Sequence, residues 1–173
     1  MEDIIIEPLG GEHPRGAFCC KLKAIDNFFI KHSLDRHEAY ALRVFVARRP
    51  DDNTPLGFYS LTTMTFQPGM NEEADAKFGR FDAIPSIYLS MIARDQASQK
   101  GLGDFLMINA FKRALEVREH IGVYAITLHA YNEKVRANYE RLGFQAFADD
   151  RKLGEFPAMF IPLSTVAATF DAA

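Results

Sequence analysis

The apolar residues of the first third of the chain recur every three or four positions, as they do on one face of an amphipathic helix. Between Lys21 and about Tyr40 the positions with this spacing are Leu22, Ile25, Phe28, Phe29 and Ile30. The spacing predicts one or two helices that cover a sheet. The next two segments, 42–48 and 56–66, are rich in β-branched and aromatic residues, and turn-forming residues at 50–55 separate them. This arrangement predicts an antiparallel hairpin.

A second set of elements follows the polar stretch 67–85. The pattern predicts a strand at 86–93, a loop at 95–103 and a helix from about Asp104 to His120, with Gly122 as a stop signal. A further strand at 124–130 and a helix at 133–142 come next. Strand, helix and strand in this order form a crossover whose two strands are parallel. Further strands around 144–147 and 158–163 complete a mixed sheet with helices on its faces.

The composition is that of a globular protein, with 48% apolar residues in a chain of 173. This length favours one domain over residues 1–173. No apolar run approaches the ~18 residues of a membrane span, and the first residues lack the pattern of a signal peptide, so a cytoplasmic protein is expected. Cys19 and Cys20 are adjacent and are expected to be reduced. His32 and His37 are five residues apart and share no helix face, so no metal site is expected.

Charge excludes a molecule that is basic throughout, because the net charge is −3 at pH 7. The distribution is uneven, however. Residues 13–50 contain eight lysines and arginines but only three acids, Asp26, Asp35 and Glu38. This excess is available to form a basic patch, or else the charges lie on a solvated helix face.

Gly101 and Gly103 stand at the predicted junction between a strand and a helix. The first amide groups of a helix lack partners within it, and glycine lets a ligand come close to them. Such a terminus can hold a phosphate, and Lys100 adds a positive charge. Neither the dinucleotide fingerprint nor the P-loop sequence is present.

A second motif lies at 132–144, where Asn132 is followed by the sequence Tyr-Glu-Arg-Leu-Gly-Phe that begins at Tyr139. With this motif after the glycine loop, residues 42–163 resemble the GNAT superfamily of acyl-CoA-dependent N-acetyltransferases. The resemblance implies an α/β fold with a mixed, mostly antiparallel sheet of six to seven strands. It also implies a central pair of parallel, splayed strands and about four flanking helices.

The resemblance also implies the site of acetyl-CoA. The backbone amides that would surround the pyrophosphate are those of Ser98, Gln99, Lys100, Gly101, Leu102 and Gly103. The end of the preceding strand, Ile92, Ala93 and Arg94, would pair with the pantetheine arm and direct an N–H group at the thioester carbonyl. Asn132 would contact the cofactor arm. The loop departs from the family pattern at Ser98 and Gln99, where the family usually has Gln or Arg and often Gly.

Tyr139 is implied to be the general acid. A phenol with a reference pKa of ~10 is still protonated at neutral pH and can donate to the departing sulfur. His129, near a strand end, could accept a proton from the attacking amine, although a hydrogen-bonded structural role is the more common one for such a histidine. No general base is assigned.

Three functions stay open at the level of sequence. The segment from Phe18 to Phe29, together with Ile84-Pro85, resembles the GNAT toxins of toxin–antitoxin pairs. This resemblance implies acetylation of aminoacyl-tRNA and a ribbon-helix-helix antitoxin, and it leaves a homodimer open, whereas the acidic pI of about 5.9 argues against RNA. A metabolic or protein N-acetyltransferase for a small or peptidic amine is the alternative, with a pocket shaped by Glu72, Glu73 and Asp75. The third is a module that binds CoA without turnover.

Overall fold

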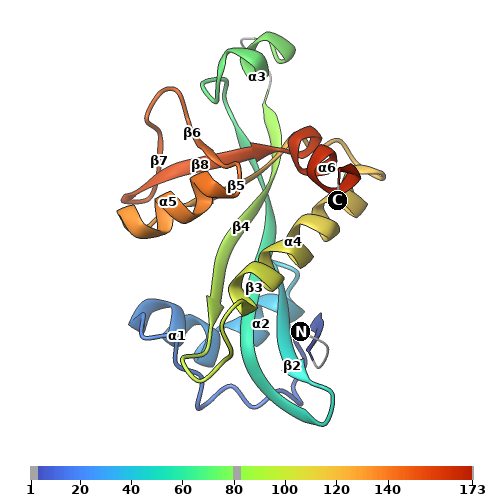
Figure 1. Ribbon diagram of the computed structural model, residues 1–173, viewed down its shortest axis with the longest axis vertical. Coiled ribbons are helices and arrows are strands. Elements are labelled where there is room, and N and C mark those ends of the chain that lie inside the picture. The colour runs from blue at the N-terminus through green and yellow to red at the C-terminus, as the bar shows by residue number, and fades with distance from the viewer. Residues whose placement is uncertain (1–3, 80–82, 173) are drawn as a thin grey trace. The chain divides into compact units, whose positions relative to one another are not determined.

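The computed structural model describes residues 4–79 and 83–172. Among these residues are six helices and eight strands, coloured along the chain in Figure 1. The helices are α1 (Lys23–Lys31), α2 (Ser33–Glu38), α3 (Glu72–Lys77), α4 (Leu102–Arg118), α5 (Glu133–Arg141) and α6 (Leu163–Asp171). The strands are β1 (Ile5–Pro8), β2 (Arg43–Arg49), β3 (Asp52–Phe66), β4 (Ile84–Arg94), β5 (Ala125–His129), β6 (Gln145–Ala146), β7 (Lys152–Leu153) and β8 (Phe156–Pro162).

The strands form a mixed sheet in the order β1-β2-β3-β4-β5-β8-β6, with β7 paired to β8. The pairs β1–β2, β2–β3, β5–β8, β6–β8 and β7–β8 are antiparallel. In contrast, β4 and β5 are parallel, with Ser86 opposite Ala125 and Tyr88 opposite Thr127. The expected α/β fold with a mostly antiparallel sheet and one parallel pair is therefore confirmed, with eight strands where six to seven were expected and six helices where about four were expected.

The additional elements are short or carry weak sequence signals. β1 has four residues and ends at a proline, and β7 has only two residues. α3 is a six-residue helix inside the stretch that the sequence analysis treated as a loop, and Asn71 caps it by accepting from the Ala74 amide at 2.8 Å. Elements this short carry too few residues for a periodic pattern to be recognised.

Two compact units make up the chain, one formed by Met1–Thr62 and Leu89–Ala110 and the other by Thr63–Tyr88 and Phe111–Ala173. β3, β4 and α4 each contribute residues to both units. The expectation of a single domain over residues 1–173 stays a prediction. None of the helices in the described part of the chain is long and apolar enough to cross a membrane.

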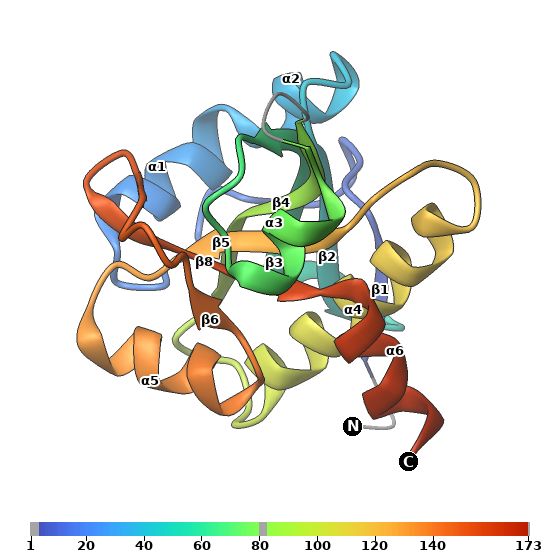
Figure 2. The ribbon, with the colours of Figure 1, turned by 90° about the horizontal axis from the view of Figure 1, so that it is seen from above.

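Each unit has its own buried cluster of apolar side chains. In the first unit, the hairpin β2–β3 and helix α1 enclose Phe29, Val44 and Phe58, which are fully buried. In the second unit, β8 and its neighbours bury Ala125, Phe147 and Phe160. Helix α5 lies beside β6 in Figures 1 and 2, as the short connection after Arg141 requires.

Candidate active site

Asp95 fixes the turn that follows β4. Its backbone N–H donates to the carbonyl of Leu56 at 2.8 Å. Its carboxylate accepts the amide of Cys19 at 2.8 Å through Oδ2 and the amide of Ala97 at 2.8 Å through Oδ1. Three bonds from one residue tie this turn to β3 and to the segment before α1. The sequence analysis missed this role, although an aspartate directly after a strand is a known signal for such a turn.

The first turn of α4 carries a row of backbone amides without partners. The N–H groups of Gln99, Lys100, Gly101, Gly103 and Asp104 make no hydrogen bond to another residue in the described ranges 4–79 and 83–172. Leu102 N–H reaches the carbonyl of Gln99 only at 3.5 Å. Unpaired amides and the positive end of a 17-residue helix favour an anion at this place.

Gly101, Gly103 and Gly57 differ in backbone conformation and in the space around them. Gly101 has a φ of +92°, a conformation that other residues rarely adopt. A Cβ at Gly103 would meet no atom within 4 Å, so the space around this amide is open. A Cβ at Gly57 of β3 would lie 3.0 Å from the carbonyl oxygen of Ala93, so only glycine allows this close packing.

Apart from Asn132, which belongs to the second unit, the remaining predicted cofactor residues lie in the first unit, on β4 and the turn after it. Ile92 and Ala93 are half-buried, whereas Arg94 and Lys100 are exposed. The guanidinium of Arg94 lies 3.4 Å from both the carbonyl oxygen and the hydroxyl of Ser98. The structure therefore gathers the predicted pyrophosphate and pantetheine residues along one short path. Their contact with acetyl-CoA stays a prediction.

Tyr139 is held in place by the end of α5. The Phe144 N–H donates to the Tyr139 carbonyl and the Gly143 N–H donates to the Glu140 carbonyl, both at 3.0 Å. Gly143 has a φ of +96°. These bonds define a Schellman motif, which also favours an apolar contact between the residues that here are Tyr139 and Phe144. Their ring centroids lie 5.7 Å apart. The Gly-Phe part of the motif thus positions the tyrosine.

The phenol of Tyr139 is half-buried. Burial raises its pKa to about 12, and the neighbouring Tyr131 acts in the same direction. Its hydroxyl makes no hydrogen bond to any residue that the structure describes. The group therefore keeps its proton at neutral pH and has that proton available for a ligand.

Asn132 is the N-cap of α5. Its side-chain oxygen accepts the amide of Val135 at 2.9 Å, and the residue is exposed. An asparagine at this position stabilises the first turn of a helix. The structure thus gives Asn132 a local role, and the contact with the cofactor arm stays a prediction.

His129 lies at the end of β5 beside Tyr88 of β4. The Tyr88 hydroxyl and His129 Nδ1 are 2.9 Å apart, and the imidazole stacks on Phe156 with 5.3 Å between the ring centroids. Burial lowers the pKa of His129 and raises that of Tyr88, so both are neutral at pH 7. One ring nitrogen is thus engaged within the protein, which agrees with the structural interpretation.

The structure also describes the two cysteines and the side chains that could bind a metal ion. Cys19 and Cys20 are both free thiols, and burial raises the pKa of Cys20 to about 11. A thiol with this pKa is a poor nucleophile at neutral pH. In the described part of the chain, no three His, Cys, Asp or Glu side chains form a group that could hold a metal ion.

Comparison with solved structures defines the fold. A KacT variant with tyrosine replaced by phenylalanine has a TM-score of 0.86 and 24% identity, and the match covers 96% of this chain and 99% of that one. AtaT in complex with acetyl-methionyl-tRNA has a TM-score of 0.85 and 24% identity, over 97% and 99% of the two chains. AtaTR bound with acetyl-CoA has a TM-score of 0.82 and 24% identity, over 98% and 99%. The chain has the fold of these GNAT acetyltransferases.

Two relatives define the family. The probable toxin TacT of Sinorhizobium fredii is 32% identical over 94% of this chain and 92% of its own length. The tRNA-acetylating toxin of Mycobacterium tuberculosis is 33% identical over 73% of this chain and 75% of its own length. No protein-family model matches the chain. By these identities and coverages, the chain belongs to the family of acetyltransferase toxins that contains TacT and the tRNA-acetylating toxin.

Proposed function

We propose that this protein is a toxin that transfers the acetyl group of acetyl-CoA to the α-amine of aminoacyl-tRNA. The observation that carries the proposal is the row of unpaired amides from Gln99 to Asp104 in a chain of this family. The name of the Mycobacterium tuberculosis relative and the tRNA complex of AtaT support the substrate. The acetyl-CoA bound to AtaTR supports the donor.

The loop from Ser98 to Gly103 suits a pyrophosphate, because the amides of Gln99, Lys100, Gly101 and Gly103 are unpaired N–H donors at a helix N-terminus. The Ser98 N–H already donates to the carbonyl of Asp95 at 3.0 Å. Lys100 adds a charged donor that is exposed. Acetyl-CoA supplies an acetyl group activated as a thioester. We assign Ile92, Ala93 and Arg94 to the pantetheine arm, with a backbone N–H of this strand donating to the thioester carbonyl. That bond would stabilise the negative charge that the oxygen gains when the amine attacks.

Tyr139 would act as the general acid. Its high pKa keeps the phenol protonated, and its hydroxyl has no competing partner among the described residues. When the carbon–sulfur bond breaks, the phenol donates its proton to the sulfur of CoA. The new amide nitrogen loses a proton to water, and the phenolate takes one back from solvent. No side chain is needed as a base, because an α-amine with a reference pKa near 8 is partly neutral at pH 7.

Contacts of Glu73 and Asp75 in the second unit argue against the alternative substrate, a small or peptidic amine. Glu73 pairs with Lys77 at 2.7 Å, and Asp75 accepts the amide of Gly69 at 2.7 Å. Two of the three acids expected to attract a cationic amine are therefore engaged within and beside α3. A module that binds CoA without turnover would have no use for a proton donor held as Tyr139 is held.

We infer that an antitoxin of the ribbon-helix-helix type neutralises the protein and that the protein forms a homodimer. AtaT bound to the C-terminus of the antitoxin AtaR supports a partner of this kind. Co-expression with a small ribbon-helix-helix protein encoded beside the toxin gene should relieve growth arrest. Light scattering should give twice the chain mass of 19.5 kDa.

Replacing Tyr139 with phenylalanine tests the mechanism. We expect kcat for acetylation of charged tRNA to fall by about 10²-fold or more, the usual loss of a positioned acid. The affinity for acetyl-CoA should not change, since the ring contact with Phe144 remains. Turnover is measured with radiolabelled acetyl-CoA, and affinity by calorimetry.

The same variant separates the alternatives. Expression of the wild type should arrest growth, and Tyr139→Phe should relieve the arrest. Equal turnover by the variant would remove Tyr139 from the mechanism. Harmless wild-type expression together with acetylation of free amines would favour the small-molecule enzyme, and binding of acetyl-CoA without turnover would favour the module.

A further inference from the structure

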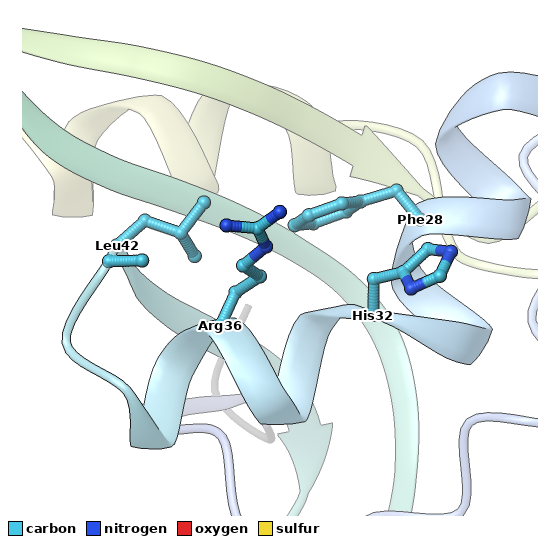
Figure 3. A pocket seen from close by; sticks show the side chains of 5 residues that line it. Phe28, His32, Arg36 and Leu42 are labelled. Atoms are coloured by element: carbon cyan, nitrogen blue, oxygen red, sulfur yellow. The ribbon is translucent and has the colours of Figure 1, made fainter.

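A pocket of about 390 Å³ opens on the first unit, between α1, α2 and the start of β2. Its lining consists of Phe28, His32, Arg36, Ala41 and Leu42. Phe28, His32 and Arg36 are spaced by four residues, so they follow one side of the helical path. Figure 3 shows the guanidinium of Arg36 between the side chains of Leu42 and Phe28, with His32 beside the phenyl ring.

Arg36 brings an uncompensated positive charge to this pocket. Its side chain is exposed and makes no hydrogen bond or ion pair with a residue in the part of the chain that the structure describes. Arg43 and Arg48 differ, because Arg43 donates to the carbonyl of His37 at 3.2 Å and Arg48 pairs with Glu7. A free guanidinium offers a planar pair of donors that suits a phosphate.

The apolar residues on either side of this guanidinium are supported by the core. The ring of Phe28 stacks on Phe58 with 6.5 Å between the centroids, and Phe58 stacks on Phe29 at 4.1 Å. Leu42 packs against the same buried cluster. A flat apolar wall of this kind can hold a planar ring such as a nucleobase.

The pocket also lies near the proposed path of the cofactor within this unit. Met91 and Ala93 of β4 pack against the same buried cluster as Phe28 and Leu42. Ala93 is one of the residues that we assign to the pantetheine arm. A group bound in this pocket would therefore rest on the same buried cluster that supports the strand assigned to the pantetheine arm.

We propose that this pocket binds the 3′-terminal adenosine of aminoacyl-tRNA, with its base against Phe28 and its 5′-phosphate on Arg36. The proposal rests on the proposed function, and it names the part of the RNA that the protein recognises. The terminal nucleotide carries the aminoacyl ester and must lie next to the acetyl group. It also joins a planar base to a phosphate, which matches an apolar wall beside a free guanidinium. Every tRNA ends in this nucleotide, so the pocket would serve any charged tRNA.

Binding of the trinucleotide CCA, labelled with fluorescein at its 5′ end, tests the proposal without acetyl transfer. Arg36→Gln should raise the Kd by about 10-fold, as expected for loss of one charge-assisted contact. It should also reduce the salt dependence by about 0.7 in the slope of log Kd against log salt concentration. Phe28→Leu should weaken binding as well, by about 10-fold. Lys31→Gln is the matched control, because Lys31 is exposed on α1 but does not line the pocket, and it should change Kd less than about 2-fold.

The thermal midpoint of each variant shows whether it folds. The side chain of Arg36 is exposed and without partners among the described residues, so Arg36→Gln should unfold at the wild-type temperature. An unchanged Kd in this variant would overturn the proposal. The proposal would also be overturned if Arg36→Gln kept its affinity for the trinucleotide but no longer bound an antitoxin peptide. The pocket would then be a protein-binding site. Failure of the wild type to acetylate charged tRNA, with CCA binding lost in Arg36→Gln, would contradict the proposed function but support this pocket as a nucleotide site.

Discussion

Gly101 and Gly103 stand two residues apart at the start of α4 but differ in their backbone conformation and surroundings. The backbone of Gly101 requires glycine, because its φ is +92°. Gly103 is surrounded by open space, so glycine there serves only to keep the amide accessible. The difference can be measured by adding one methyl group at each position.

Gly101→Ala should destabilise the protein by about 1–2 kcal/mol, the usual cost of a left-handed conformation for a residue with a side chain. Gly103→Ala should leave the thermal midpoint equal or slightly higher, because alanine favours helix. It should nevertheless weaken acetyl-CoA binding by about 10-fold, since its methyl group enters the space in front of the amides. Thermal unfolding and calorimetric titration give the two quantities. An unchanged affinity in Gly103→Ala would place the pyrophosphate elsewhere.

At the scale of the residue, the sequence marks candidate site residues but does not show the contacts that hold them in place. Tyr139, Gly101 and Gly103 stood out because a motif or a junction marked them. Asp95 did not, because two of its three hydrogen bonds depend on the approach of Leu56 and Cys19, which are distant in sequence. The pocket around Arg36 was missed for a related reason, since a surface arginine looks the same in the sequence whether it has a partner or not.

At the scale of the element, α5 shows how a helix end positions the side chain that we propose as the general acid. Tyr139 occupies the third position from the end of the helix, where the Schellman motif brings it against Phe144. Phe144 in turn packs on Phe111 of α4, with 5.9 Å between the ring centroids. The orientation of the phenol therefore depends on Gly143, which allows the chain to reverse.

Gly143→Ala should cost about 1–2 kcal/mol of stability, because φ is +96° and a Cβ would lie 3.3 Å from Ile161. For a chain of this length, each kcal/mol lowers the thermal midpoint by about 2–4 °C. The kcat for acetyl transfer should fall with it, since Tyr139 loses its fixed place. Gly122→Ala is the control, because a Cβ there meets no atom within 4 Å. Equal midpoints for the two variants would contradict the role of Gly143.

The elements that the sequence predicted correctly are those with sustained patterns. The hairpin of β2 and β3, the strand-helix-strand unit of β4, α4 and β5, and α5 are all confirmed within a few residues. α6 was missed because its sequence, Leu163–Asp171, continues directly from β8 without a break. Its N-cap is Pro162, which gives no side-chain capping signal.

At the scale of the whole molecule, the buried His37 and the half-buried His129 make stability depend on pH. Burial lowers the pKa of both His37 and His129 below 6.5, with Arg43 contributing at His37. The unfolded chain then binds more protons than the folded one between the folded and unfolded pKa values. Stability is therefore fully present above about pH 6.5 and decreases as the pH falls below it. Glu7 acts in a lower range, because the Arg48 guanidinium lowers its pKa below 4.5.

We expect the thermal midpoint to fall by a few degrees between pH 7 and pH 5, and further below pH 4.5 as Glu7 takes up a proton. His129→Gln should flatten the first of these two steps. The exposed His120 provides the control, since His120→Gln should leave both steps unchanged. Circular dichroism across the pH series measures the midpoints. A midpoint that rises on acidification from pH 7 to 5 would be the wrong sign for buried neutral histidines.

The unpaired N–H groups at the N-terminus of α4 also affect the choice of buffer for this protein. We expect sulfate or phosphate in a purification buffer to compete for these N–H groups with the pyrophosphate of acetyl-CoA, whose binding there we propose. By mass action, the apparent dissociation constant of acetyl-CoA rises with the ratio of the ion's concentration to the ion's own dissociation constant. The bound ion also raises the melting temperature of the protein without acetyl-CoA. Assays in a zwitterionic buffer with chloride will therefore report tighter binding than assays in phosphate.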